Sequence, residues 1–131
     1  MIGVDANVLI RYLVQDDPLQ SAQATEFFEQ RLSLDETGFI STVVLAETAW
    51  VLQRSYRWNG PELASILERL LQADVLVIEH EQPVADAVRS LKRGAGSFAD
   101  ALIGALANKA GCSHTVTFDK GALRIAGFKP V

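Results

Sequence analysis

The sequence is poor in cysteine, with one residue, Cys112, among 131. A single thiol cannot form a disulfide within the chain, and no group of cysteine and histidine residues has the spacing of a zinc site. Disulfide-rich secreted scaffolds and zinc fingers are therefore excluded, and a reducing compartment is expected. The two histidines, His80 and His114, fall at the edges of expected strands and suggest no role.

Positive charge is also scarce, with 12 Lys and Arg against 16 Asp and Glu, a formal net charge of −4. Such a chain has no overall basic field to attract nucleic acid, so a polyanionic substrate must be met by local cations or bound metal. The stretch from Met1 to Leu13 lacks a basic leader and contains Asp5 and Asn7, which fits neither a signal peptide nor a membrane span. We therefore expect a cytoplasmic protein.

The chain does contain enough apolar residues for a core, with 49% hydrophobic and 21% charged residues. This composition and length predict a single domain over residues 1–131. Short apolar runs alternate with amphipathic segments, which is typical of an α/β fold with a mainly parallel central sheet flanked by helices. We see no repeat, linker or low-complexity segment.

Periodicity and turn residues give the expected elements. Strands are predicted over 1–4, 39–41, 75–78 (as a central strand), 114–118 and 128–131. Helices are predicted over 6–14, from Pro18, over 42–56, from Pro61, over 83–93 and over 98–110, with a short helix before the last strand. The helix after Pro61 has the clearest apolar face, formed by Leu63, Ile66, Leu67, Leu70 and Leu71.

Four acidic residues stand where a parallel α/β fold places its ligands, beyond the carboxyl ends of the strands. Asp5 and Asp119 end two of the strands, Asp100 lies in the first turn of a helix, and Glu47 lies about one turn into another. Each also has an ordinary interpretation. Asp5 and Asp119 could cap the helices that follow, Ser97 and Asp100 match a capping box, and Glu47 could be a solvated glutamate.

Glu47 is the hardest of the four to explain by structure alone, because its helical neighbours include Val43, Val44, Trp50 and Val51. A carboxylate among apolar groups is costly unless something pairs with it. If all four acids converge, two like charges about 5 Å apart repel by roughly 3 kcal/mol at an effective dielectric of about 20. Protonation or bound cations must then relieve the repulsion.

An all-oxygen cluster without cysteine or a nearby histidine favours Mg²⁺ or Mn²⁺ over Zn²⁺. Such ions polarise a phosphodiester oxygen, lower the pKa of a bound water and neutralise the departing oxygen. The pattern therefore indicates a metal nuclease.

The same residues resemble the PIN-domain family. The resemblance is carried by residues 5–9 (DANVL), residues 45–48 (LAET), residues 98–103 (FADALI) and residues 117–119 (TFD), in this order and over the whole chain. It implies a PIN-like three-layer sandwich and a Mg²⁺- or Mn²⁺-dependent endoribonuclease. One departure is Ala6, where the family often has Thr or Ser, and no metal ligand is lost by it.

The resemblance also implies roles for individual residues. Asp5, Glu47, Asp100 and Asp119 would be the catalytic metal ligands, and Asn7, Ser97 and Thr117 would orient the substrate or the ligands. The small size is similar to VapC-type toxins of toxin–antitoxin pairs, which implies a homodimer and a VapB-type antitoxin as partners. Phe27, Phe28 and Trp50 could contribute to such a surface, but the core is the more ordinary place for them.

Two other classes stay open. A receiver-like phosphoacceptor domain is also a small parallel α/β fold with acids at strand ends, but it should have adjacent acidic residues after its first strand, and here Ala6 follows Asp5. A PIN-like fold could also keep its carboxylates and act as a non-catalytic binding module. A dehalogenase-type phosphatase would need a second Asp at position 7, where Asn7 stands.

Overall fold

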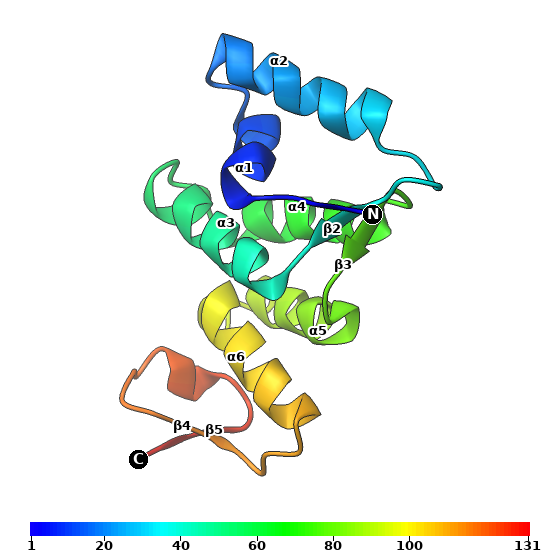
Figure 1. Ribbon diagram of the computed structural model, residues 1–131. Helices are drawn as coiled ribbons and strands as arrows, with labels where there is room; N and C mark the ends of the chain where they lie inside the picture. The colour runs from blue at the N-terminus through cyan, green and yellow to red at the C-terminus, as the bar shows by residue number, and fades with distance from the viewer.

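The computed structural model describes residues 1–131 and has the expected α/β organisation, with every expected strand and helix present (Figure 1). The strands are β1 (Ile2–Gly3), β2 (Gly38–Ile40), β3 (Leu76–Ile78), β4 (Thr115–Thr117) and β5 (Phe128–Pro130). The α-helices are α1 (Ala6–Val14), α2 (Pro18–Glu26), α3 (Thr42–Arg54), α4 (Gly60–Gln72), α5 (Glu81–Lys92) and α6 (Phe98–Lys109). A π-helical turn, η1 (Phe27–Arg31), follows α2, and a 3₁₀ turn, η2 (Ala122–Arg124), precedes β5.

Polar side chains begin most of the helices where the sequence predicts. Asp17 and Ser41 accept hydrogen bonds from backbone N–H groups in the first turns of α2 and α3. Asn59 forms a reciprocal capping box with Glu62 at the start of α4. Each such side chain satisfies an N–H group that the helix leaves without a partner, so local sequence determines these boundaries.

The strands form two separate parallel sheets. β2 pairs with β1 on one side and with β3 on the other, which gives the order β1-β2-β3, while β4 pairs with β5 alone. Helix α6 lies between the two sheets in Figure 1. The expectation that residues 75–78 form a central strand is wrong, because β3 is at the edge of its sheet and β2 is central.

The second sheet packs against helix α6 at a glycine, Gly104. A Cβ atom added to Gly104 would lie 2.5 Å from Cε2 of Phe128, so the ring of this β5 residue rests on the glycine. This close contact holds β5 against α6, and β4 pairs with β5 rather than with β1. The division of the sheet was not predicted from the sequence.

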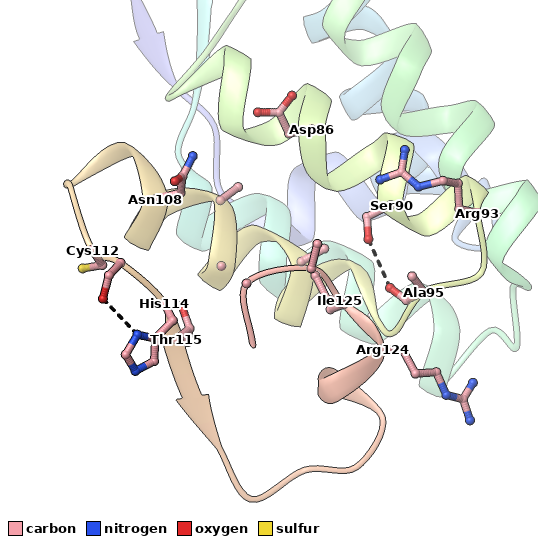
Figure 2. A pocket seen from close by; sticks show the side chains of 16 residues that line it. Asp86, Ser90, Arg93, Ala95, Asn108, Cys112, His114, Thr115, Arg124 and Ile125 are labelled. Carbon is pink, nitrogen blue, oxygen red and sulfur yellow. Dashed lines mark hydrogen bonds between the residues drawn. The ribbon is translucent and has the colours of Figure 1, made fainter. Parts of the chain in front are cut away.

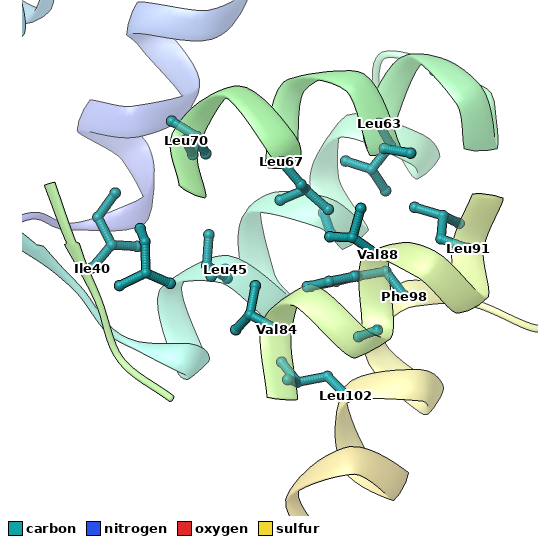
Figure 3. Packing of buried hydrophobic residues seen from close by; sticks show 14 of the residues in the cluster. Ile40, Leu45, Leu63, Leu67, Leu70, Val84, Val88, Leu91, Phe98 and Leu102 are labelled. Carbon is teal, nitrogen blue, oxygen red and sulfur yellow. The ribbon is translucent and has the colours of Figure 1, made fainter. Parts of the chain in front are cut away.

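The hydrophobic core lies between α3, α4, α5 and the first half of α6 (Figure 3). Leu63, Leu67 and Leu70 of α4 are buried, as the apolar pattern predicts, and Phe98 of α6 is 1% exposed. On α5 the core side chains are Val84, Val88 and Leu91, the predicted apolar side of that helix. None of the helices combines the length and the hydrophobicity needed to cross a bilayer.

Candidate functional site

Asp5 lies directly after β1 and is the N-cap of α1. One oxygen of its carboxylate, Oδ1, accepts a hydrogen bond from the N–H of Ala6 at 2.8 Å, and the side chain makes no other hydrogen bond or ion pair. The capping role foreseen for Asp5 is therefore present. The residue is exposed, so the rest of the carboxylate remains accessible to a ligand.

Glu47 lies in the middle of α3, a helix that contacts both α1 and α6. Its side chain is exposed, and so are those of Val43 and Trp50 on the same helix face, at 73% and 56%. The apolar neighbours therefore do not bury the carboxylate, and the desolvation cost inferred from the sequence does not arise. The expectation that Trp50 belongs to the core is wrong, whereas Phe28 is buried as expected.

Asp100 and Ser97 lie together at the start of α6. The hydroxyl of Ser97 accepts a hydrogen bond from the backbone N–H of Asp100 at 3.1 Å, which makes Ser97 the N-cap. The Asp100 carboxylate returns no bond to Ser97, so the capping box is not complete. This half-buried carboxylate has neither a hydrogen-bond partner nor an ion-pair partner.

Asp119 and Thr117 form a tight turn at the end of β4. The hydroxyl of Thr117 accepts from the N–H of Asp119 at 2.9 Å, and Oδ1 of Asp119 accepts from the N–H of Gly121 at 2.8 Å. Asp119 thus stabilises the turn before η2 rather than capping an α-helix. It follows the second sheet, whereas Asp5 follows the first.

The structure therefore places the four predicted ligands on separate elements without gathering them. No three His, Cys, Asp or Glu side chains lie close enough together to hold a metal ion. The oxygen donors are of the type that Mg²⁺ and Mn²⁺ prefer, but one copy of the chain does not arrange them as a coordination site. None of the four carboxylates lies within 4.0 Å of a basic group; the ion pairs involve Asp16, Glu36, Glu68 and Asp86 instead.

Asn7, the other predicted site residue, lines a pocket of about 370 Å³ between α1 and α2, together with Arg11, Gln20 and Phe27. Arg11 is engaged there, since its guanidinium donates to Asp16 at 3.0 Å and to Gln20 at 2.8 Å. This arrangement leaves Arg11 little freedom to hold a phosphate.

A larger pocket of about 490 Å³ lies between α5, α6 and the segment around β4 and η2 (Figure 2). Arg93 and Arg124 border it and form no ion pair with any carboxylate. His114 lies at its rim, where Nδ1 is 2.9 Å from the hydroxyl of Ser113. The pocket thus offers two free guanidinium groups, and its lining also includes Asp86, which is paired with Arg89.

The sequence reasoning did not single out Glu79 and Thr42. Glu79 ends β3, and its Oε1 accepts from the backbone N–H and the hydroxyl of Thr42, at 2.9 and 3.0 Å. These two hydrogen bonds, the backbone one first, lower the pKa of Glu79. The available signal was an acidic residue at a strand end, because Glu79 occupies the same kind of position as Asp5 and Asp119.

The chain matches the PIN domain over residues 2–128, and it belongs to this family. The family predicted from the four sequence segments is thereby confirmed. Over almost its full length the chain is also similar to a VapC ribonuclease of Aquifex aeolicus (strain VF5). The two are 24% identical over 129 residues, which cover 98% of this chain and 93% of that protein.

Proposed function

We propose that this PIN-domain protein is a Mg²⁺- or Mn²⁺-dependent endoribonuclease and the toxin of a VapBC-type pair. The observation that carries the proposal is the match to the PIN domain over residues 2–128. Asp5, Glu47, Asp100 and Asp119, the acids of its four sequence segments, form no ion pair. Carboxylates that are left without cations of the protein are available to cations from solution.

We propose that the four carboxylates hold the divalent ion. When bound, such an ion polarises the phosphodiester and lowers the pKa of a water molecule. Ser97 and Thr117 position two of the acids, since their hydroxyl groups accept from the backbone N–H groups of Asp100 and Asp119. Asn7 is proposed to contact the substrate. Because one copy does not bring the four acids together, no step of hydrolysis is assigned to them in the single chain.

RNA binding is proposed to depend on local cations, since the chain has a net negative charge. Arg93 and Arg124 are suited to this role because they line the same pocket and are free of ion pairs. Lys92, next to Arg93, is less suited because its Nζ lies 2.7 Å from Oε1 of Glu68. Guanidinium groups bind phosphate in a bidentate manner.

A cytoplasmic location, a homodimer and a VapB-type antitoxin complete the proposal. The similarity to a VapC ribonuclease supports the antitoxin. The exposed face of α3 is a suitable surface for the antitoxin. It presents Trp50, whose ring lies 5.2 Å from the guanidinium carbon of Arg54, next to the Glu47 carboxylate. A basic antitoxin side chain could then approach Glu47.

The direct test is cleavage of structured RNA by the purified chain with Mg²⁺, with Mn²⁺ and with EDTA. We expect metal-dependent cleavage that falls by about 100-fold or more in Asp5→Asn and in Asp100→Asn, because each removes a charged ligand. Asp74→Asn, a change at an exposed acid outside the site, is the matched control and should cleave as the wild type does. Undiminished cleavage in both site variants would reject the assigned roles.

A further inference from the structure

Helices α1 and α2 pack against each other at the end of the molecule opposite β4 and β5 (Figure 1). The pocket between them, of about 370 Å³, is at the lower end of the range for sites that bind small ligands. Its lining includes three primary amides, one aromatic ring and one guanidinium group, which belong to Asn7, Gln20, Gln23, Phe27 and Arg11. A pocket of this size holds one small group rather than a segment of a partner protein.

The face of α2 that borders this pocket carries amides where packing alone would need apolar side chains. The four α2 residues of the lining recur at helical spacing and therefore share one face; they are Gln20, Gln23, Ala24 and Phe27. A helix face that packs against a neighbour is normally apolar, whereas two of these four residues are glutamines. Both glutamines are exposed, as solvated residues are, but a third amide from α1 and an aromatic ring meet them at the same pocket.

The hydrogen-bonding groups of the three amides are largely unused. Nε of Arg11 donates to Oε1 of Gln20 at 2.8 Å, which leaves the NH₂ group of Gln20 as a free donor. The side-chain amides of Asn7 and Gln23 make no hydrogen bond within the chain. Each of these two amides presents a donor beside an acceptor, the pattern that pairs with N6 and N7 of adenine. No carboxylate lines the pocket, although a carboxylate is the group suited to the two adjacent donors on the Watson–Crick edge of guanine.

Phe27 gives the pocket a flat apolar wall whose position is fixed by its neighbours. The ring of Phe28, which is buried, lies 5.3 Å from the Phe27 ring at an angle of 80°. Phe27 also begins the π-helical turn η1, in which the N–H of Leu32 donates to the Phe27 carbonyl at 3.1 Å. Such turns are frequent at functional sites. The Phe27 ring is half-buried, and rings of this kind stack with any nucleobase.

A free cation lies beside this ring. The guanidinium carbon of Arg31 is 6.0 Å from the centroid of the Phe27 ring, and Arg31 forms no ion pair. A guanidinium group can bind a phosphate through two parallel hydrogen bonds. Arg31 is therefore suited to hold the phosphate of a nucleotide whose base stacks on Phe27. Arg11, which is paired with Asp16, instead positions the amide of Gln20.

We propose that the pocket between α1 and α2 binds one unstacked adenine of single-stranded RNA. Phe27 stacks on the base, and the amides of Asn7 and Gln23 pair with its edge. Arg31 holds the adjoining phosphate. Sequence-specific recognition of RNA generally uses bases that are splayed out of a single strand and bound in this way. Asn7 follows Asp5 by two residues, so a base held here selects the bond that is cleaved; this last step rests on the proposed nuclease function.

Binding measured in EDTA tests the pocket without reference to cleavage. Fluorescein-labelled hexaribonucleotides of sequence UUXUUU, in which X is A, G, C or U, are titrated with the protein, and fluorescence anisotropy gives each Kd. We expect the oligonucleotide with adenine to bind tightest, by about 5-fold or more over the one with guanine. Equal Kd values for the four oligonucleotides, or tightest binding with another base, overturn the proposal.

Three variants separate the roles of the pocket residues. Gln23→Ala should remove the preference for adenine, and its fold should persist because alanine favours a helix. Phe27→Leu should weaken binding of all four oligonucleotides by about 5-fold or more without a change in their order, because stacking does not depend on the base. Arg31→Gln should lower the slope of log Kd against log salt concentration by about 0.7, the share of one phosphate contact.

Gln72→Ala, at an exposed glutamine of α4 outside the pocket, is the matched control and should bind as the wild type does. A Gln23→Ala chain that has the wild-type circular dichroism spectrum and still prefers adenine overturns the proposal, even if Phe27→Leu does not fold.

Cleavage with Mg²⁺ distinguishes this inference from the proposed nuclease function. The wild type should cut an RNA of mixed sequence preferentially next to adenine, and Gln23→Ala should lose this preference. Selective binding of adenine without any cleavage would reject the nuclease function and support the pocket. Cleavage without a base preference, in a protein that binds the four oligonucleotides equally, would reject the pocket and support the nuclease function.

Discussion

Residues 1–110 and residues 111–131 differ sharply in how they are stabilised. Of the 30 buried residues, two, Ala122 and Ile125, belong to the shorter region. The longer region has a three-stranded sheet and a core formed mainly by four helices, whereas the shorter one rests on Gly104 of α6 through Phe128 and on Gly96 through Ile125. Both regions contain the same local sequence signals for strands and turns. They differ in that helices pack over the strands of the longer region, whereas most of the shorter region is left exposed.

This difference divides the predicted active site. Asp5, Glu47 and Asp100 belong to the longer region, on elements that pack around α3, and Asp119 belongs to the shorter one. Activity should therefore depend on the position of residues 111–131, whereas the free energy of unfolding should depend on residues 1–110. Substitutions in the two regions can separate activity from stability.

The largest effect is expected from truncation of the core. Phe98→Ala should lower the free energy of unfolding by about 3 to 5 kcal/mol, because it removes a buried ring and leaves a cavity. Phe118→Ser, at a ring that is 90% exposed, should change it by less than about 0.5 kcal/mol in dilute solution. Urea titration followed by circular dichroism measures both.

Phe98→Leu is the second variant for the case in which Phe98→Ala does not fold, and its loss should be smaller. Similar losses of unfolding free energy in Phe98→Leu and Phe118→Ser would mean that the two regions are equally well packed, which would contradict the difference described above.

The sequence predicted the secondary structure of both regions well, because its signals are local. Asp5, Ser41 and Asn59 cap helices where their types and positions indicate, and apolar periodicity placed the core faces of α4 and α5. The order of the strands could not be predicted from the sequence. Whether β4 lies beside β1 depends on contacts such as that of Phe128 with Gly104, and no local pattern encodes such a contact.

The candidate site could be predicted in its residue types and not in its geometry. The positions of Asp5 and Asp119 at strand ends followed from the apolar runs before them, but their convergence required the two strands to share a sheet. Trp50 was assigned to the core by its hydrophobicity, although helical spacing alone does not show which face of α3 is covered. Tertiary placement, rather than local preference, determined both outcomes.

The second largest effect should come from the contact that holds the shorter region. Gly104→Ala brings a methyl group to 2.5 Å from the ring of Phe128, and overpacking of this kind costs about 1 to 3 kcal/mol. We expect faster hydrogen exchange of residues 111–131, with α4 and α5 unaffected. Hydrogen exchange with mass spectrometry measures each region separately. Equal acceleration in both regions would show that they unfold as one unit.

A smaller effect is expected in the difference between two glycine variants of the loop between α5 and α6. Gly94 and Gly96 both have φ of +73°, a conformation that costs alanine about 1 to 2 kcal/mol. Only at Gly96 would the new methyl also meet a side chain, Ile125, at 2.7 Å. Gly96→Ala should therefore destabilise more than Gly94→Ala and should loosen η2 in addition. Equal urea midpoints for the two variants would mean that Ile125 moves aside freely.

The smallest effect should be a dependence on pH confined to the longer region. The hydrogen bonds from Thr42 lower the pKa of Glu79, so the charged carboxylate stabilises the folded state above its unfolded pKa, and this contribution is lost as the pH falls through the folded value. Glu79→Gln should lower the urea midpoint at pH 7, and the difference from the wild type should shrink as the pH falls through the lowered pKa of Glu79 in the folded state. Thr42→Ser keeps both donors and should retain the wild-type pH profile. Thr42→Val loses the hydroxyl donor, so its profile should lie between those of the wild type and Glu79→Gln.

Because Glu79 joins β3 to α3, hydrogen exchange of residues 111–131 should stay the same in all three variants. A change there would mean that the stability of residues 111–131 depends on the first sheet.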